Sequence, residues 1–305
     1  MKILEIGKVD LASLCYLNKE RYPFLLESVN HNDNNRYSIL FAFPRKSIVL
    51  ENFSDFNFLS ELEDQFNANN ININLPFLGG WFVYLSYELI GQIEPNLSAE
   101  LHTSELPIAY AVKIPSAIII DHKINTTFLM DKDSDQNRID TILADIDAIK
   151  PIPEVDVLGE FDQENEDKFI SGVKACLDYI VAGDVFQVNL SREWQYNLTK
   201  EIDSAIIYQA LKNANPAPFS ALVQYENFSI VSSSPERLFS VKEGVLQTRP
   251  IAGTHPRGEG SEDEAQKADL ISHPKEIAEH VMLLDLERND MGRVCEYGSV
   301  FVNEV

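Results

Sequence analysis

Four short strand patterns follow one another between residues 219 and 250, and they constrain the fold more than any other feature of the sequence. Alternating apolar residues predict strands at Phe219–Gln224, Ser229–Ser233, Leu238–Lys242 and Val245–Pro250. Glu243-Gly244 is typical of the hairpin turn between the last two. Strands that succeed one another without intervening helices favour an α+β fold and argue against the alternating order of a Rossmann fold.

Helical patterns surround this run of strands. The segment Glu164–Ala182 is predicted as an amphipathic helix by the spacing of Phe169, Val173, Cys176 and Ile180. Gly183 stands where a helix-ending glycine belongs. A second helix is predicted at Ser204–Lys212, and a third at Pro274–Asp290 with proline in its first turn.

The first half of the chain mixes strands and helices. Arg36–Ala42 and Ser47–Leu50 are interpreted as a strand pair. Ile108–Ile120 is predicted as a strand bent at Pro115, and Thr127–Met130 as a continuation of the same sheet.

A domain boundary is predicted where two prolines and a cluster of carboxylates follow a helical segment, at Ile149–Asp167. This boundary divides the chain into an N-terminal subdomain, residues 1–155, and a second domain, residues 156–305.

The charge excludes two classes of partner. A net charge of −23 without a basic stripe repels nucleic acid and anionic membranes. The longest apolar run is far shorter than the ~20 residues that a membrane span needs. Three scattered cysteines and the absence of a secretory signal at the start indicate a reducing compartment, so we expect a cytoplasmic protein. A small anion would need a metal ion or aimed backbone amides to bind here.

Two segments hold candidate chemistry near the strands. Glu236 ends a strand, and a glutamate sheltered from solvent there is a candidate general acid. The alternative is a salt bridge between Glu236 and Arg237 or a nearby lysine. The loop at Ile251–Thr254 offers backbone amides and the hydroxyl of Thr254 to a ligand.

Two other segments hold polar side chains whose role stays open. Asp184–Trp194 is predicted as a strand with Gln187 on its polar face, which faces either solvent or a site. In the last helix Glu279 and His280 diverge by ~100° and cannot form the i, i+4 pair of a zinc helix. A hard, oxygen-liganded cation at one carboxylate is the better hypothesis.

Several long motifs in one order resemble the chorismate-utilising enzymes: "GDVFQVNLSREW", "APFSALVQ", "SSSPERLF", "QTRPIAGTHPRG" and "KEIAEHVMLLDLERNDMGRV". "RYPFLLES", "RYSIL" and "LPFLGGWFVYLSYEL" extend the likeness over nearly the whole chain. This family comprises component I of anthranilate synthase, component I of aminodeoxychorismate synthase, and the isochorismate and salicylate synthases. The resemblance implies an αββα sandwich of the anthranilate synthase component I type and an active site that uses Mg²⁺.

The resemblance also implies roles for single residues. Glu236 resembles the catalytic glutamate that helps the C4 hydroxyl of chorismate to depart, and Glu279 resembles a Mg²⁺ ligand. Gly253 and Thr254 match the loop beside the substrate. Gln187 stands where the isochorismate and salicylate synthases have the lysine that activates water, so addition of ammonia is favoured over addition of water.

Two products remain open within the resemblance. The segments "APFSA", "QTRPI", "SSPER" and "GGWFVYLSYEL" favour component I of aminodeoxychorismate synthase, which acts in para-aminobenzoate and folate biosynthesis. Ala252 lies at the catalytic position where well-known aminodeoxychorismate synthases have a nucleophilic lysine, and anthranilate synthases have alanine there. Anthranilate synthase component I, of the tryptophan pathway, is therefore the alternative.

Partners are implied as well. A glutamine amidotransferase subunit is expected to supply ammonia, since no cysteine here has the context of a glutaminase site. Leu26, Glu27 and Ser28 resemble the lining of an N-terminal tryptophan pocket, with an ordinary amphipathic segment as the alternative.

The printed sequence stops at Val305, before the family's later motifs for a histidine, a second Mg²⁺ glutamate and the carboxylate-binding arginine and tyrosine. The resemblance therefore implies a C-terminally truncated domain, and we expect the 305-residue chain alone to be inactive. A non-catalytic remnant that binds a partner or an effector is the third alternative.

Overall fold

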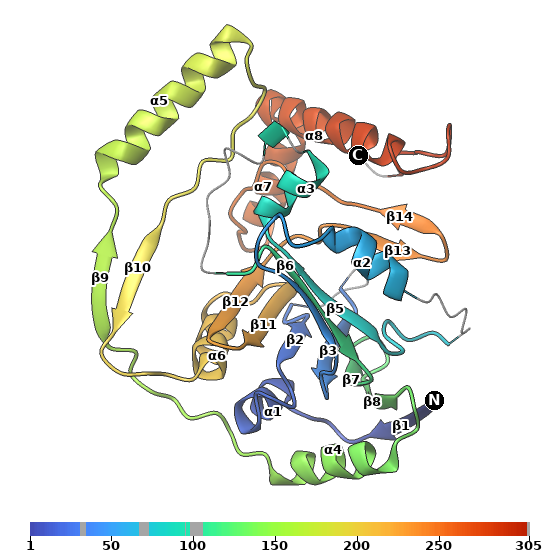
Figure 1. The fold of residues 1–305 in the computed structure, drawn as a ribbon. Helices are drawn as coiled ribbons and strands as arrows, with labels where there is room; N and C mark the ends of the chain where they lie inside the picture. The colour runs from blue at the N-terminus through green and yellow to red at the C-terminus, as the bar shows by residue number, and fades with distance from the viewer. Residues whose placement is uncertain (31–34, 67–72, 95, 98–105, 304–305) are drawn as a thin grey trace.

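The computed structural model describes residues 1–30, 35–66, 73–94, 96–97 and 106–303, and most of the N-terminal half forms a layered body (Figure 1). In the described part of the chain, seven strands form one sheet in which all neighbours are antiparallel. The spatial order of this large sheet is β1 (Lys2–Ile6), β8 (Thr126–Asp131), β7 (Ser116–Asp121), β3 (Tyr37–Ala42), β2 (Phe24–Glu27), β11 (Phe219–Tyr225) and β12 (Phe228–Ser234).

The large sheet thus combines strands from both sides of residue 155, the boundary expected from the sequence. The division into residues 1–155 and 156–305 stays a prediction.

Alternate side chains of the large sheet enter two different cores, because successive residues of a strand point to opposite faces. Leu25 and Leu40 are fully buried against one layer of helices, together with Leu14 and Cys15 of that layer. The helices of this layer are α1 (Leu11–Leu17), α4 (Gln136–Ala148) and α6 (Ser204–Ala214). Burial of these side chains is the main stabilising term of the body.

The opposite face of the large sheet packs on a second sheet. The ring of Phe24 stacks on that of Phe82 with 4.1 Å between the centroids. The strands of this small sheet are β4 (Ser47–Leu50), β6 (Ala109–Ile114) and β5 (Gly80–Leu85). Its outer face packs on Phe58 and Leu89.

These last two residues belong to a second layer of helices, formed by α2 (Phe58–Gln65), the 3₁₀ turn η1 (Tyr87–Leu89) and α3 (Ile90–Ile93). The layers are therefore helices, large sheet, small sheet and helices, which confirms the α+β class and the αββα arrangement.

Two expectations about strand partners change in the structure. The bend at Pro115 is the point where the chain leaves the small sheet at the end of β6 and enters the large sheet at β7. The pairing of Arg36–Ala42 with Ser47–Leu50 is wrong, because β3 belongs to the large sheet and β4 to the small one. Alternation predicts a strand but does not identify its neighbour, which explains the error.

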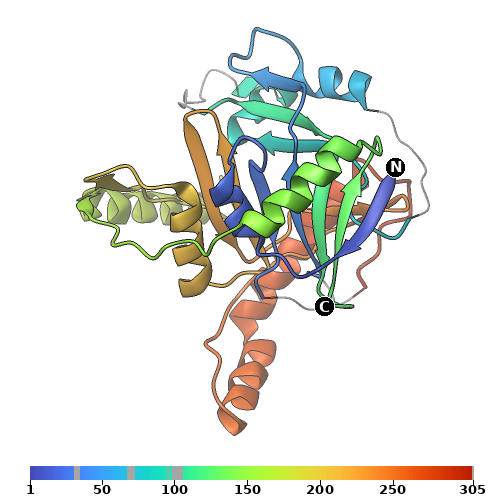
Figure 2. The same ribbon diagram turned by 90° about the horizontal axis from the view of Figure 1, so that it is seen from below.

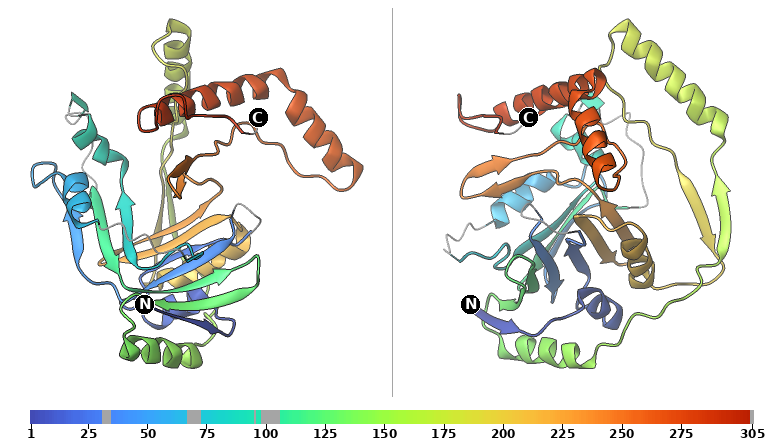
Figure 3. Two further views of the ribbon diagram at one scale, coloured as in Figure 1. Left: turned by 90° about the vertical axis from the view of Figure 1, so that its right-hand side faces the viewer. Right: turned by 180° about the vertical axis from the view of Figure 1, so that it is seen from behind.

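An arm and a pair of helices project from the body (Figures 1 and 2). The arm is a ribbon of β9 (Gly159–Gln163) and β10 (Trp194–Leu198) that carries α5 (Glu166–Ala182). The hairpin β13 (Ser240–Lys242) and β14 (Val245–Gln247) leads to helices α7 (Ser261–Ser272) and α8 (Pro274–Gly292), which extend over one end of the sheets (Figure 3). We call the arm and this C-terminal region the projecting part.

Helix α5 ends as expected, with Gly183 at φ 82°. The strand predicted at Asp184–Trp194 is wrong apart from its last residue, since residues 185–193 are irregular. The alternating pattern there has no paired strand within the described chain, and Phe186 is 90% exposed. None of the described helices is long and apolar enough to cross a membrane.

Candidate active site

Glu236 contacts the loop that the sequence analysis singled out. It follows β12, and its Oε1 accepts the backbone N–H of Ile251 at 2.9 Å. The hydroxyl of Ser234 donates to the carbonyl of Glu236 at 3.1 Å, which shapes the turn after the strand. The Glu236 side chain is exposed, so the expected shelter from solvent is absent in the described chain. The structure nevertheless joins the strand end and the loop, which lie 15 residues apart.

The middle of the loop lies against helix α8. A Cβ atom at Gly253 would overlap the carboxylate of Glu276, which stands in the first turn of the helix. A larger residue at position 253 would therefore require the Glu276 side chain to move away from the loop. The sequence alone does not reveal this contact, since Glu276 is ordinary for a first helical turn.

Glu279 stands three residues after Glu276 on the same helix and is half-buried. Residues three apart are neighbours on a helix surface, so both carboxylates belong to the side of α8 near the loop. Ala252 is half-buried, whereas Thr254 is exposed. The structure therefore brings together the loop, Glu236 and the start of α8.

A cleft of about 440 Å³ continues from this point between α8, the β14 strand and the last described residues. Thr248 and Arg249 line one wall, and His280 and Glu287 line the other. The Oε2 atom of Glu287 is buried and has no hydrogen-bond partner in the described part of the chain. A buried acceptor without a donor is unfavourable and marks a place that suits a ligand or a water molecule.

Gln187 is not joined to this group. It lies in the irregular segment between α5 and β10, and its side chain is exposed. Among the described residues, no hydrogen bond or ion pair links it to Glu236 or Gly253. The sequence placed Gln187 on the polar face of a strand, but that strand does not form, and the side chain faces solvent.

The N-terminal candidates lie in and after β2. Glu27 accepts hydrogen bonds from the hydroxyl of Tyr208 at 2.7 Å and from Nζ of Lys212 at 2.9 Å. Burial and the neighbouring Glu27 carboxylate raise the pKa of Tyr208, so its hydroxyl is a stable donor. Leu26 is 40% exposed. A tryptophan pocket at this segment stays a prediction.

Ser28, the next residue, is buried, and its hydroxyl donates to the carbonyl of Tyr37 at 2.9 Å. The sheet register places Glu27 opposite Ser220, and Ser220 opposite Ser233. The N-terminal segment is therefore two strands away from the strand that leads to Glu236.

The described residues contain no group of three or more histidine, cysteine, aspartate or glutamate side chains that could hold a metal ion. Glu276 and Glu279 remain as a pair of hard oxygen donors beside the loop. Mg²⁺ commonly takes only one or two carboxylates from a protein and completes its shell with water and substrate. The pair fits such a site.

The chain is similar to proteins of known family. The family model described as chorismate binding enzyme matches residues 22–305. The anthranilate synthase component I-like protein of Synechocystis sp. is 36% identical over 286 residues, which are 91% of this chain and 59% of that protein. The aminodeoxychorismate synthase component 1 of Bacillus subtilis is 39% identical over 241 residues, which are 75% of this chain and 51% of that protein.

A solved structure has the same fold. The crystal structure of anthranilate synthase component I from Streptococcus pneumoniae TIGR4 matches with a TM-score of 0.75 at 28% identity. The match covers 92% of this chain and 66% of that one. The chain thus spans between half and two thirds of the length of these three proteins.

Proposed function

The chain belongs to the chorismate-binding enzyme family, and we propose that it functions as component I of aminodeoxychorismate synthase, which aminates chorismate to 4-amino-4-deoxychorismate. The contact between the Glu236 carboxylate and the Ile251 amide carries this proposal. It unites a candidate proton donor with a loop that offers amides and a hydroxyl to a ligand. The aminodeoxychorismate synthase component 1 of Bacillus subtilis, at 39% identity, supports the proposal, while relatives named anthranilate synthase component 1 support the second candidate below.

In this proposal Glu236 acts as the general acid. It donates a proton to the C4 hydroxyl of chorismate, so that the C4–O bond breaks and water departs, and ammonia supplies the nitrogen that is bonded to C4 in the product. General acid catalysis of this kind typically contributes ~10²–10⁴-fold to the rate. Gly253 and Thr254 hold the ring side of the substrate through the loop backbone and the Thr254 hydroxyl.

Mg²⁺ would be held by Glu279, with Glu276 as the neighbouring carboxylate. The bound ion would supply the positive charge that a dianionic substrate needs in a chain of net charge −23. The residues of the chain itself would orient the substrate through the loop, which is in turn supported by its contact with the first turn of α8.

Ammonia is proposed to come from a glutamine amidotransferase subunit. The Bacillus subtilis relative is named component 1, which supports the existence of a second component that acts with it. Cys15 is fully buried in α1, and burial raises the pKa of its thiol, so it is unsuited to attack glutamine.

One observation favours a second candidate, component I of anthranilate synthase. The loop carries Ala252, and a methyl group cannot serve as the covalent nucleophile that the resemblance associates with aminodeoxychorismate synthases. Direct attack of ammonia on C2 of the ring, as in anthranilate synthases, needs no such nucleophile and is therefore compatible with alanine.

The products distinguish the candidates. Because the 305-residue chain alone is expected to be inactive, the assay uses a chain that also carries the family's later motifs. It is incubated with chorismate, Mg²⁺ and ammonium at alkaline pH, and the products are separated by chromatography. Aminodeoxychorismate supports the proposal, and anthranilate alone replaces it with the second candidate. Chorismate binding by calorimetry without either product indicates the non-catalytic alternative.

The role of Glu236 is tested with Glu236→Gln. We expect most activity to be lost while chorismate still binds, because the amide cannot donate the proton. Glu243→Gln is the matched control, since Glu243 is an exposed glutamate in the β13–β14 turn. Equal activity in the two variants would remove Glu236 from the mechanism.

A further inference from the structure

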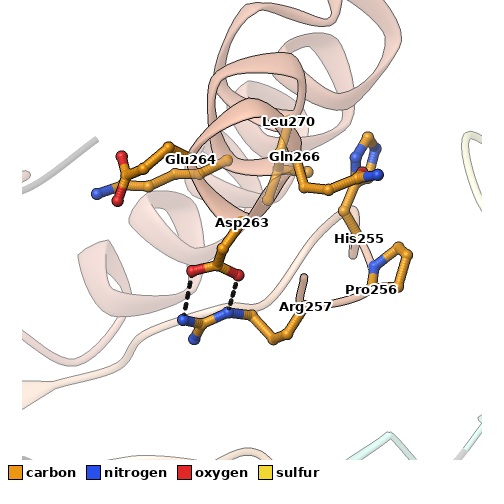
Figure 4. A pocket seen from close by; sticks show the side chains of 8 residues that line it. His255, Pro256, Arg257, Asp263, Glu264, Gln266 and Leu270 are labelled. Atoms are coloured by element: carbon orange, nitrogen blue, oxygen red, sulfur yellow. Dashed lines mark hydrogen bonds and ion pairs between the residues drawn. The ribbon is translucent and has the colours of Figure 1, made fainter. Parts of the chain in front are cut away.

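The loop is attached at a second point, beyond the residues assigned to the substrate. The Arg257 guanidinium binds both carboxylate oxygens of Asp263, with Nε–Oδ1 at 2.5 Å and a second hydrogen bond to Oδ2 at 2.6 Å (Figure 4). The backbone N–H of Gly258 also donates to Oδ1 of Asp263, at 3.2 Å. Asp263 lies in the first turn of α7, so this attachment ties the end of the loop to that helix.

The two attachments hold the two ends of residues 251–258, which we call the ligand loop. Its start is held by Glu236 through the amide of Ile251, and its end by Asp263 through Arg257 and Gly258. The residues between them are irregular and have no helix or strand to fix their backbone. Other contacts of this segment are the amide of Ile251 with Glu236, the approach of Gly253 to Glu276 and the approach of His255 to Asp269.

Helices α7 and α8 are adjacent in the chain. Helix α7 ends at Ser272 and α8 begins at Pro274, so only His273 separates them. An attachment to α7 therefore also relates the loop to the helix that carries Glu276 and Glu279. His255 Nδ1 lies 3.6 Å from Oδ2 of Asp269, which places a second loop side chain against α7.

We propose that the Arg257–Asp263 pair is a positioning element that holds the ligand loop against Glu236 and α8 before substrate binds. The identity of the substrate rests on the proposed function, whereas the ordering of the loop does not. Order that exists before binding lowers the entropy that must be lost when the ligand binds. Loss of the pair is therefore expected to weaken binding more than it slows the chemical step.

The chemistry of the pair suits this role. A planar guanidinium that donates two parallel hydrogen bonds fixes direction as well as distance, which a lysine cannot do. Hydrogen bonds from Arg257 lower the pKa of Asp263, so the pair stays ionised at neutral pH. Arg257 is 87% exposed and Asp263 is 20% exposed, so the expected effects are small multiples rather than orders of magnitude.

Hydrogen exchange of the full 305-residue chain, followed by mass spectrometry, tests the ordering directly. The variants are Arg257→Gln, Asp263→Asn and the double variant. Asn at position 263 keeps an oxygen for the amide of Gly258, so the variants isolate the ion pair. Arg45→Gln is the matched control, because Arg45 forms an exposed pair with Asp133 at 3.1 Å on the body.

We expect peptides that cover residues 250–258 to exchange about two- to fivefold faster in each single variant. The double variant should exchange no faster than either single variant, because both remove one interaction. The control should match the wild type. An unchanged loop, additive effects, or equal acceleration throughout α7 and α8 would overturn the proposal.

A second readout links the loop to its ligand. Titration with chorismate in the presence of Mg²⁺ should give a dissociation constant that rises by the same factor in Arg257→Gln as the exchange rate, with no change in Arg45→Gln. An equal dissociation constant in both variants would contradict the positioning role. Failure of the wild type to bind chorismate would count against the proposed function, while the exchange comparison would still decide whether the pair orders the loop.

Discussion

The body and the projecting part contain similar apolar patterns but bury them very differently. In α1 of the body, Leu14 and Cys15 are fully buried. In α5 of the arm, Leu177 is 56% exposed and Val181 is 89% exposed. Every fully buried apolar side chain of the described residues lies in the body, and α5, α7 and α8 contribute none in that part of the chain.

The difference teaches that an apolar stripe specifies a helix but not a core. Helix α6 packs on α1 and on β12, so its Tyr208 becomes fully buried. Helix α5 has an equally regular stripe, yet its neighbour is the irregular segment around Leu190. Burial needs a second surface, and the stripe does not supply one.

Ion pairs show the same contrast. In the body, Arg138 binds both oxygens of Asp131 at 2.7 and 2.9 Å, and Asp131 is fully buried. In the projecting part, Arg257 also binds both oxygens of Asp263, at 2.5 and 2.6 Å, but the Arg257 side chain is 87% exposed. Both pairs are therefore bidentate, but the first is buried in the body and the second is exposed to solvent.

The largest expected effect is on the free energy of unfolding, and it differs between these two ion pairs. Arg138→Met leaves the buried Asp131 carboxylate without its cation and is expected to lower the free energy of unfolding by about 3–5 kcal/mol. Arg257→Gln is expected to leave the free energy of unfolding unchanged, because water replaces the lost partner. Urea unfolding curves of both variants measure the difference, and equal midpoints would contradict the contrast.

The next effect concerns apolar side chains. Leu40→Ala removes a fully buried side chain from the core between the large sheet and the helices, and we expect a loss of about 2–4 kcal/mol. Leu177→Ala on α5 should cost under about 0.5 kcal/mol. Thermal or urea unfolding checks both values. A comparable loss at Leu177 would show that α5 is buried in solution.

A third expectation concerns acid. Burial alone would raise the pKa of Asp131, but hydrogen bonds from Arg138 and Ser116 outweigh it and lower the pKa. The pair formed by Asp121 and Arg36 follows the same order of causes. A lowered pKa in the folded state gives stability that is complete above the ordinary aspartate pKa of ~3.9 and is lost as the pH falls towards the lower folded value.

We therefore expect the unfolding midpoint in urea to stay level between about pH 7 and 5 and to decrease below about pH 4. Asp131→Asn lacks this titration, so its midpoint should be lower at neutral pH and should decrease less on acidification. A wild-type midpoint that rises between pH 4 and 3 would reverse the assigned sign.

The smallest effect on stability is expected on the arm, where the readout is association. Exposed apolar surface on α5 favours self-association. Replacing Leu177 and Val181 by glutamine should reduce the sedimentation coefficient at high concentration without changing the unfolding midpoint. Leu59→Gln on α2, where Leu59 is 40% exposed in the body, is the control and should leave association unchanged. Association that persists in the arm variant would locate the contact elsewhere.

The sequence by itself determined the elements that depend on near neighbours. The amphipathic pattern and Gly183 predict α5, Pro274 predicts the start of α8, and Glu243-Gly244 predicts the turn between β13 and β14. Each of these signals acts over a few residues, through helical period, capping or a positive φ angle. The long motifs between residues 183 and 294, taken together in their order, likewise indicate the family without any tertiary contact.

The tertiary structure alone decided which of these elements meet. It turned the bend at Pro115 into a change of sheet, and it left residues 185–193 irregular. It also brought Gly253 against Glu276 and Arg257 onto Asp263. Period and capping are local properties of the chain, whereas strand partners, burial and side-chain contacts depend on surfaces contributed by residues far along it, so no local pattern contains them.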